Sequence, residues 1–145
     1  MSTNLGVIRG ATEQEVLSKK FNIYVGISLG NKWFTKDHIK EHLLWALKHT
    51  KERAGLLVAD TLHAINYEVK EKKSVENARK KALRKGDEMI SILKEIIKEL
   101  PKEQQSKVDI IRWDDVKAND YYKDFLSTIT KEYEKYRMIN GIFQR

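Results

Sequence analysis

The sequence has no cysteine, one proline and seven glycines among its 145 residues. Without cysteine, a disulfide scaffold, a thiolate metal site and a cysteine nucleophile are all excluded. So little proline and glycine argues against a disordered or collagen-like chain. The longest apolar runs are about the length of Leu56–Ala59, far short of the roughly 20 residues that span a bilayer. We therefore expect no membrane partner.

The first 20 residues also lack the apolar core of a secretory signal peptide, and they carry Glu13 and Glu15. A cytoplasmic location is the resulting expectation. We interpret residues 1–20 as a tail or short helix. The length of the remainder, 21–145, suits a single domain with one core.

Positive charge is concentrated in one segment of the chain. The net charge is +7, and residues 70–85 contribute most of it, with eight basic side chains against two acidic ones. A local excess of this kind attracts polyanions, nucleic acid foremost. The alternative is an ordinary solvated helix face. The basic residues are Lys70, Lys72, Lys73, Arg79, Lys80, Lys81, Arg84 and Lys85.

Three segments have the residue pattern of parallel strands. Residues 21–28 are rich in β-branched and aromatic side chains and are predicted to form a buried strand. Residues 55–60 are apolar almost throughout, as in strands buried on both faces. Residues 107–113 predict a third strand.

Helical periodicity fills the intervals between these strands. Thr35 is a suitable N-cap for a helix with apolar positions at Ile39, Leu43, Ala46 and Leu47. A short helix is expected over residues 61–69, and the longest over 74–100, closed by Pro101. A last helix begins at about Asn119, and we expect its apolar stripe to form core: Tyr122, Phe125, Leu126, Ile129, Tyr133 and Tyr136.

Strands that alternate with helices predict an α/β, Rossmann-like, three-layer fold with a parallel sheet and helices on both faces. In such sheets the ligand binds beyond the carboxyl ends of the strands. This places residues 28–31 and 59–61 at the predicted site. Three strands are few for this architecture, so the chain is expected to be the front part of a larger fold.

Two short motifs suggest chemistry. Residues 26–30 match G-x-S-x-G, the nucleophile elbow of serine hydrolases, at the end of a strand. A serine esterase would also need an acid and a histidine, for which Asp60 and His63 are the candidates. The alternative is a simple turn serine.

The second motif, His38–His42, matches the H-x-x-E-H pattern of zinc peptidases. These histidines also fit the flank of an amphipathic helix, and no third ligand is evident, so no metal is expected. The sequence has no Walker motif and no G-x-G-x-x-G, so no nucleotide cofactor is expected either.

Residues 25–35, Val-Gly-Ile-Ser-Leu-Gly-Asn-Lys-Trp-Phe-Thr, and the Leu-Leu-Trp-Ala at 43–46 closely resemble the opening of the cyclodipeptide synthases. The similarity continues more loosely through the strand at 56–60, the basic helix from Ala78 and the Tyr-Tyr-containing last helix. It covers roughly residues 20–140.

The resemblance implies a fold similar to the catalytic domain of class I aminoacyl-tRNA synthetases, without an ATP step. Members of this family use two aminoacyl-tRNAs per product and release a diketopiperazine. Ser28 would be the nucleophile, Gly26 would shape the turn beneath it, and Asn31 would help to place the substrate. The tRNA-binding positions would be Arg79, Lys80, Lys81, Arg84 and Lys85.

The sequence also departs from the family. Its members are longer, and their later portion carries a tyrosine and a glutamate one helical turn apart, then a further tyrosine. A chain without that portion would be a truncated or split copy, and its exposed apolar surface predicts self-association. The alternatives to a synthase are a non-catalytic tRNA-binding module and, more weakly, a serine esterase.

Overall fold

The computed structural model describes residues 10–139. Contacts within the chain divide it into two compact units, Met1–Trp113 and Asp114–Arg145. No helix in the described range is long and apolar enough to cross a membrane.

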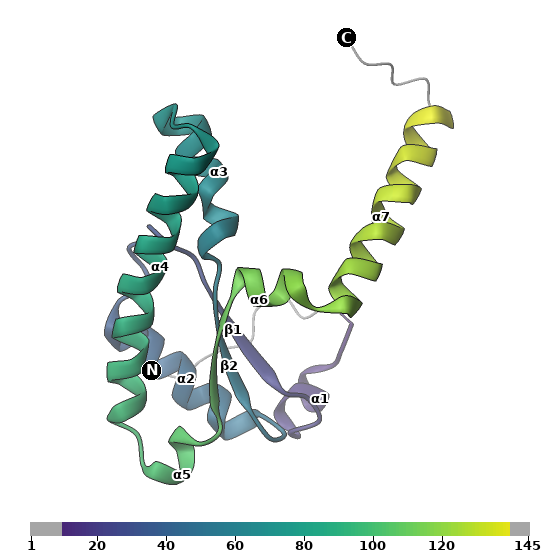
Figure 1. Cartoon of the computed structure of the whole chain (residues 1–145). Helices are drawn as coiled ribbons and strands as arrows, with labels where there is room; N and C mark the ends of the chain where they lie inside the picture. Colours follow the sequence, from purple (N-terminus) through teal and green to yellow (C-terminus); the bar gives the residue numbers. More distant parts are fainter. Residues whose placement is uncertain (1–9, 140–145) are drawn as a thin grey trace. The chain divides into compact units, whose positions relative to one another are not determined.

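The first unit contains a three-stranded parallel sheet in the order β1-β2-β3 (Figure 1). Its strands are β1 (Ile23–Ile27), β2 (Ala54–Val58) and β3 (Val108–Arg112). Ile27 lies opposite Val58, and Val58 lies opposite Arg112, so the three strands end level with one another. All three predicted strands are present, each somewhat shorter than expected, and the Rossmann-like α/β fold is confirmed.

The expectation that the first strand is buried is wrong in the described chain. Strand β1 lies at an edge of the sheet, and only Ile27 is fully buried. Tyr24 is 60% exposed because alternate residues of a strand face opposite sides. Its ring lies over Gly55 of β2, where a Cβ would overlap it.

Helices precede, connect and follow the strands. They are α1 (Glu13–Leu17), α2 (Lys36–His49), α3 (Asp60–Glu71), α4 (Val75–Lys98) and α5 (Lys102–Gln105). Thr35 caps α2 as predicted, since its hydroxyl accepts from the His38 backbone N–H at 3.3 Å. Ser74 caps α4 in the same way, so polar side chains fix both helix starts.

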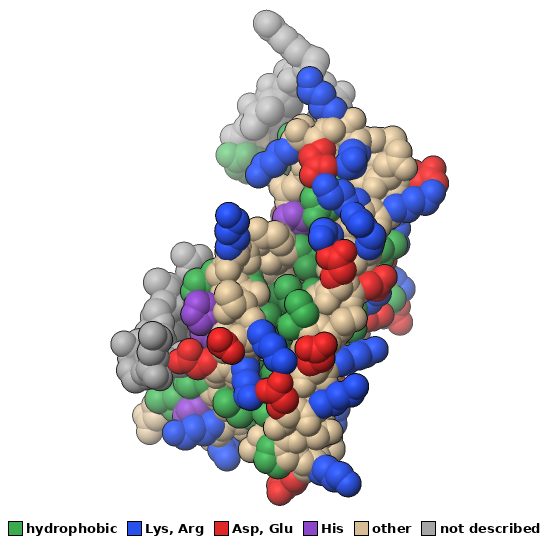
Figure 2. Space-filling model, turned by 90° about the vertical axis from the view of Figure 1, so that its left-hand side faces the viewer, with side chains coloured by type: hydrophobic (Ala, Val, Ile, Leu, Met, Phe, Trp, Pro, Cys, Tyr) green, Lys and Arg blue, Asp and Glu red, His purple; other side chains and the backbone are tan. Residues whose placement is uncertain are grey.

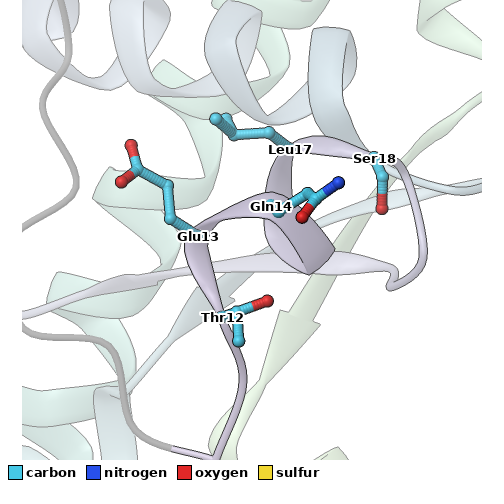
Figure 3. Close-up of a pocket in the computed structure, with 5 residues that line it drawn as sticks. All are labelled: Thr12, Glu13, Gln14, Leu17 and Ser18. Carbon is cyan, nitrogen blue, oxygen red and sulfur yellow. The ribbon is translucent and has the colours of Figure 1, made fainter.

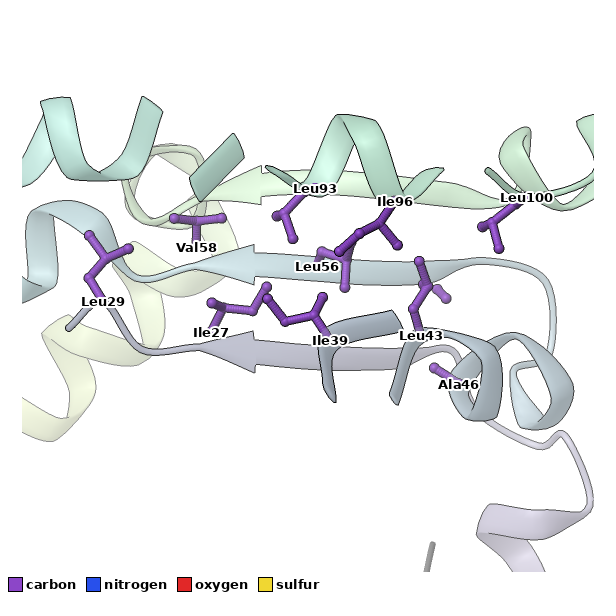
Figure 4. Packing of buried hydrophobic residues seen from close by; sticks show 11 residues of the cluster. Ile27, Leu29, Ile39, Leu43, Ala46, Leu56, Val58, Leu93, Ile96 and Leu100 are labelled. Atoms are coloured by element: carbon purple, nitrogen blue, oxygen red, sulfur yellow. The ribbon is translucent and has the colours of Figure 1, made fainter. Parts of the chain in front are cut away.

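The core lies between one face of the sheet and the pair α2 and α4 (Figure 4). The inward side chains of the strands meet Ile39 and Leu43 from α2 and Leu93 and Ile96 from α4, all nearly or fully buried. A continuous apolar stripe on each helix explains this packing. From the strands, the buried partners are Ile27, Ala54, Leu56 and Val58.

Helices α3 and α4 pack closely against each other beyond the sheet. Ala78, Ala82 and Gly86 recur every four residues on α4 and are buried against α3. Their small side chains allow the two backbones to approach. The turn between the helices passes through Lys72 in the left-handed conformation, at φ 52°. We call α3, this turn and the first half of α4 the helical hairpin.

The second unit begins within α6 (Trp113–Ala118) and continues into α7 (Asp120–Ile139). The expectation that the aromatic stripe of the last helix is core is wrong for the described chain. Five members of the stripe are 48% exposed or more: Phe125, Leu126, Ile129, Tyr133 and Tyr136, with Tyr121 beside them at 83%.

Candidate active site

Ser28 lies directly after β1, at the carboxyl edge of the sheet. Ile27 before it is buried, whereas Ser28 itself is exposed. The Ala59 backbone N–H donates to the Ile27 carbonyl at 3.3 Å. This bond holds the start of α3 beside the serine, so the two segments predicted to form the site lie at the same edge of the sheet.

The loop after Ser28 has a defined conformation. Leu29 is buried in the core and anchors the loop. Gly30 turns the chain at φ +78°, in the left-handed region that favours glycine. Gly26, the residue expected to shape this turn, lies instead within β1, outside the left-handed region and with open space where a side chain would be.

Asn31 fixes the next part of the loop. Its Oδ1 accepts from the Trp33 backbone N–H at 3.0 Å, and its carbonyl accepts from the Phe34 N–H at 3.1 Å. The side chain therefore closes an Asx turn. The amide Nδ2 of Asn31 has no hydrogen-bond partner within residues 10–139. It can therefore donate to a bound molecule without breaking a bond to the described part of the chain.

An ionic network with one buried member, Asp60, joins the carboxyl ends of β2 and β3 to α4. Asp60 is fully buried, and its Oδ2 accepts from Arg112 Nε at 2.6 Å. Arg112 also donates from Nη1 to Asp87 at 2.7 Å. Burial acts to lower the pKa of Arg112, but the hydrogen bonds to Asp60 and Asp87 outweigh it and raise that pKa. Gly86 lies so close that a Cβ would be 2.7 Å from Asp60 Oδ2.

His63 faces the serine loop from the first turns of α3. A Cβ placed on Gly30 would lie 3.7 Å from His63 Nε2. The other ring nitrogen, Nδ1, lies 3.2 Å from Asn66 Nδ2. Burial, and then Lys70, lower the pKa of His63. Because Asn66 contacts His63 while Asp60 binds Arg112, the acid–histidine pair of the esterase alternative is not formed.

The predicted tRNA-binding residues lie on several sides of α4. Arg79, Lys80 and Arg84 are exposed, and Lys80 pairs with Glu76 at 2.6 Å. Lys81 is more enclosed: it pairs with Glu71 at 2.6 Å and lies 4.4 Å from the Tyr67 ring centroid. Its first role is therefore to join the two helices of the hairpin. Lys85 pairs with Glu88 at 2.6 Å.

The basic half of α4 extends past the edge that carries Ser28. The Leu83 carbonyl accepts from Arg112 Nη2 at 3.3 Å, so this point of α4 is level with the end of β3. A helix rises about 1.5 Å per residue, so Val75 lies about 12 Å further along α4 from this point. In Figure 2 Lys and Arg side chains predominate in the upper part of the view and alternate with Asp and Glu below.

The histidines of the H-x-x-E-H pattern pack against Trp33. The His38 ring stacks on it at 4.9 Å, and the His42 ring meets it edge-on at 4.9 Å. Each Nδ1 bonds a backbone carbonyl, that of Trp33 for His38 and that of His38 for His42. Among the described residues, no three His, Cys, Asp or Glu side chains are grouped to hold a metal.

A pocket of about 730 Å³ lies on α1 (Figure 3). It is lined by Thr12, Glu13, Gln14, Leu17 and Ser18. Since α1 precedes β1, this pocket lies at the amino end of the strand, away from Ser28. None of the predicted site residues lines it.

Sequence reasoning missed Arg112, Gly86 and Asn66. A charged residue at the carboxyl end of an apolar strand was the available signal for Arg112. For Gly86 the signal was a glycine in the middle of a predicted helix. Glycine destabilises a helix interior, so its presence there indicates close packing against a neighbouring element. Asn66 offered no such signal.

Comparisons with known proteins agree with this architecture. A family model described as cyclodipeptide synthase matches residues 8–141. A search of the curated proteins gave no match.

Among solved structures, the fold is similar to a Mycobacterium tuberculosis cyclodipeptide synthetase reported to be related to type I tRNA synthetases. That match has a TM-score of 0.72 and 18% identity, and it covers 89% of this chain and 55% of the other. A Fluoribacter dumoffii protein of the family matches with a TM-score of 0.70 and 19% identity, covering 92% of this chain and 58% of the other. The synthase from Streptomyces noursei matches with a TM-score of 0.65 and 18% identity, covering 79% of this chain and 53% of the other.

At these identities the structural matches establish the fold, and the chain spans little more than half the length of each of these structures. The family model establishes more, because it matches nearly the whole sequence, including the loop from Ser28 to Asn31 and the basic part of α4. The chain belongs to the cyclodipeptide synthase family.

Proposed function

We propose that the protein takes aminoacyl groups from aminoacyl-tRNA onto Ser28 and joins two of them into a diketopiperazine. The observation that carries this proposal is the placement of an exposed serine at the carboxyl edge of the sheet, beneath a basic helical hairpin that extends past the same edge. The hairpin provides charge for the tRNA backbone, and the serine provides the acyl acceptor.

In the first step the Ser28 Oγ attacks the ester carbonyl of the aminoacyl-tRNA. A bond forms between Oγ and the carbonyl carbon, the bond to the terminal ribose oxygen breaks, and the serine proton ends on that ribose hydroxyl. Because the donor is already an activated ester, this exchange does not need the complete triad of an amide hydrolase.

In the second step the amine of a second aminoacyl-tRNA attacks the ester on Ser28. A peptide bond forms, and the proton lost by the amine restores the serine hydroxyl. The amine of the resulting dipeptidyl-tRNA then attacks its own ester. The ring closes, the bond to the ribose oxygen breaks, and the amine proton ends on that oxygen as the second tRNA leaves. Gly26 and Asn31 are proposed to line the substrate, because Gly26 leaves open space and the Asn31 amide is unengaged among the described residues.

Intact-mass measurement after incubation with aminoacyl-tRNA tests the proposal. The wild-type chain should gain the mass of one aminoacyl group, and Ser28→Ala should gain none. Ser91→Ala is the matched control, since Ser91 lies on α4 and bonds only the Asp87 carbonyl among the described residues. An adduct on Ser28→Ala would refute the assignment. Binding of tRNA with no adduct and no diketopiperazine would favour the non-catalytic module.

A further inference from the structure

The ring of His63 faces the nucleophile loop with no side chain between them. Gly30 has no Cβ, and an added one would be in contact with both Nε2, at 3.7 Å, and Cε1, at 3.9 Å. The histidine is held there by the rigid start of α3, which the bond from Ala59 to Ile27 fixes to the end of β1. The Nε2 edge of His63 is therefore directed at the loop that carries Ser28.

The contact with Asn66 determines which ring nitrogen carries the proton. An amide nitrogen only donates hydrogen bonds, so Asn66 Nδ2 requires Nδ1 of His63 to be the acceptor, at 3.2 Å. The proton of the neutral ring is then on Nε2. Burial, and then the charge of Lys70 on α3, lower the pKa of His63 and favour this neutral form. On α4, Lys81 lies over the Tyr67 ring, which in turn meets the His63 ring at 5.1 Å.

The Nε2–H group has no acceptor within the part of the chain that the structure describes. A partly buried donor without an acceptor destabilises the folded state unless water or a ligand accepts its hydrogen bond. Because this donor faces the loop of the candidate active site, a bound substrate can supply the acceptor.

We propose that His63 is a substrate-binding residue, whose Nε2–H donates a hydrogen bond to an oxygen of the aminoacyl-adenosine end bound at the loop from Ser28 to Gly30. This inference rests on the proposed function of Ser28. His63 transfers no proton in this role, because its Nε2 already carries one. Gly30 serves the contact twice, by turning the loop and by leaving the path to the ring open.

Single-turnover acylation of the full chain at sub-saturating aminoacyl-tRNA tests the contact. His63→Leu should lower the rate about five- to tenfold, the range expected when one hydrogen bond is lost. His63→Gln, which keeps an N–H donor of similar reach, should recover most of the rate. His49→Leu is the matched control and should acylate like wild type, since His49 contacts Trp45 and the Leu17 carbonyl.

A second variant tests the tautomer without removing the imidazole. Asn66→Asp replaces the amide donor with a carboxylate acceptor, which moves the ring proton to Nδ1 and raises the pKa of His63. The acylation rate should fall above the raised pKa, where the neutral ring lacks an Nε2 proton, and recover below it, because the imidazolium again carries Nε2–H. An unchanged pH profile in Asn66→Asp would overturn the inference. So would wild-type rates in His63→Leu, or a folded His63→Gln as slow as His63→Leu.

Binding of a non-reactive 3′-aminoacylamido-adenosine separates this inference from the proposed function. Its addition should shift the ¹⁵N resonance of His63 Nε2 in the wild-type chain. A shift without any Ser28 adduct from aminoacyl-tRNA would support the contact and refute the transfer. An adduct without a shift would leave the transfer standing and overturn the contact.

Discussion

Asp60 and Arg112 form a charged pair in which the carboxylate is buried and the guanidinium is partly exposed. The Asp60 carboxylate is fully buried and accepts from Arg112 and from the Thr61 backbone N–H. A buried carboxylate that loses its partner is strongly destabilising, because the charge remains without compensation. The pair therefore sets the position of α3 on the sheet, and with it the position of His63 beside the serine loop.

Gly86→Ala should destabilise the protein by about 1–3 kcal/mol, the usual cost of overpacking a close contact. The added methyl would lie 2.7 Å from Asp60 Oδ2 and 2.9 Å from Arg112 Nη2, so the network or the helix must shift. Urea unfolding measures the change. Gly26→Ala is the control, because nothing lies within 4 Å of its added Cβ. Equal unfolding midpoints for both variants would contradict this account.

At the scale of elements, the helical hairpin uses its charges for two purposes. Lys81 joins α3 to α4 through Glu71 and Tyr67. Arg84 is exposed, makes no salt bridge among the described residues, and acts on Glu88 only through its charge. A count of basic residues does not distinguish side chains that join the two helices from those that are available to bind tRNA. Contacts across the hairpin do, and they identify Arg84 as the more available charge for a phosphate.

Replacement of Arg84 and Lys85 by glutamine should weaken tRNA binding and flatten its salt dependence. Each lost phosphate contact is expected to lower the slope of log K against log salt by about one. Filter binding over a salt series measures both quantities. Lys94→Gln, on the other half of α4, should change neither. If the double variant keeps the wild-type affinity and slope, these two side chains are an ordinary solvated face.

Ion pairs between α2 and the end of α4 give the protein a dependence on pH. Hydrogen bonds from Lys40 and then Lys36 lower the pKa of Glu99 to about 2, from 4.5. A depressed folded-state pKa contributes stability above the unfolded value, and that contribution is lost as the pH falls from about 4.5 to 2. All three groups are exposed, so the effect is small and weakens with salt.

Glu99→Gln should therefore be less stable than wild type at pH 7, and the difference should disappear near pH 2. Thermal unfolding across this pH range, at low ionic strength, provides the measurement. Glu41→Gln removes a carboxylate of α2 that makes no ion pair within the described residues, and it should follow the wild-type curve. If the stability difference between Glu99→Gln and wild type is as large at pH 2 as at pH 7, the ion pairs of the Glu99 carboxylate are not its cause.

At the scale of the whole molecule, apolar surface remains open in each unit considered by itself. The helices α2 and α4 pack on one face of the sheet, and Tyr24 is exposed on the other. In the second unit the stripe of α7 is exposed along most of the helix. Surfaces of this extent are typical of association sites.

Self-association should accordingly increase with protein concentration, as measured by sedimentation velocity. Substitution of lysine for both Phe125 and Ile129, which are 57% and 48% exposed, should keep the chain monomeric over the same range. Thr128→Lys is a control on the same helix, where the hydroxyl bonds the Asp124 carbonyl. A wild-type chain that stays monomeric at all concentrations would refute the prediction.

The sequence by itself determined the local structure. The residue pattern predicted β2 and β3, Thr35 capped α2 as expected, and five of the clustered lysines and arginines lay on α4. These features depend on near neighbours, which a pattern of residues records directly. The motif around Ser28 likewise placed the serine at a strand end.

Only the tertiary structure decided what depends on distant residues. The pairing of Asp60 with Arg112, the approach of His63 to Gly30 and the engagement of Lys81 by Glu71 follow from strand order and helix packing. Periodicity also marks the apolar side of α7 but not whether a partner covers it, and here it is exposed. Such contacts form between segments far apart in the chain, so their geometry is set when the elements pack and not by the local sequence.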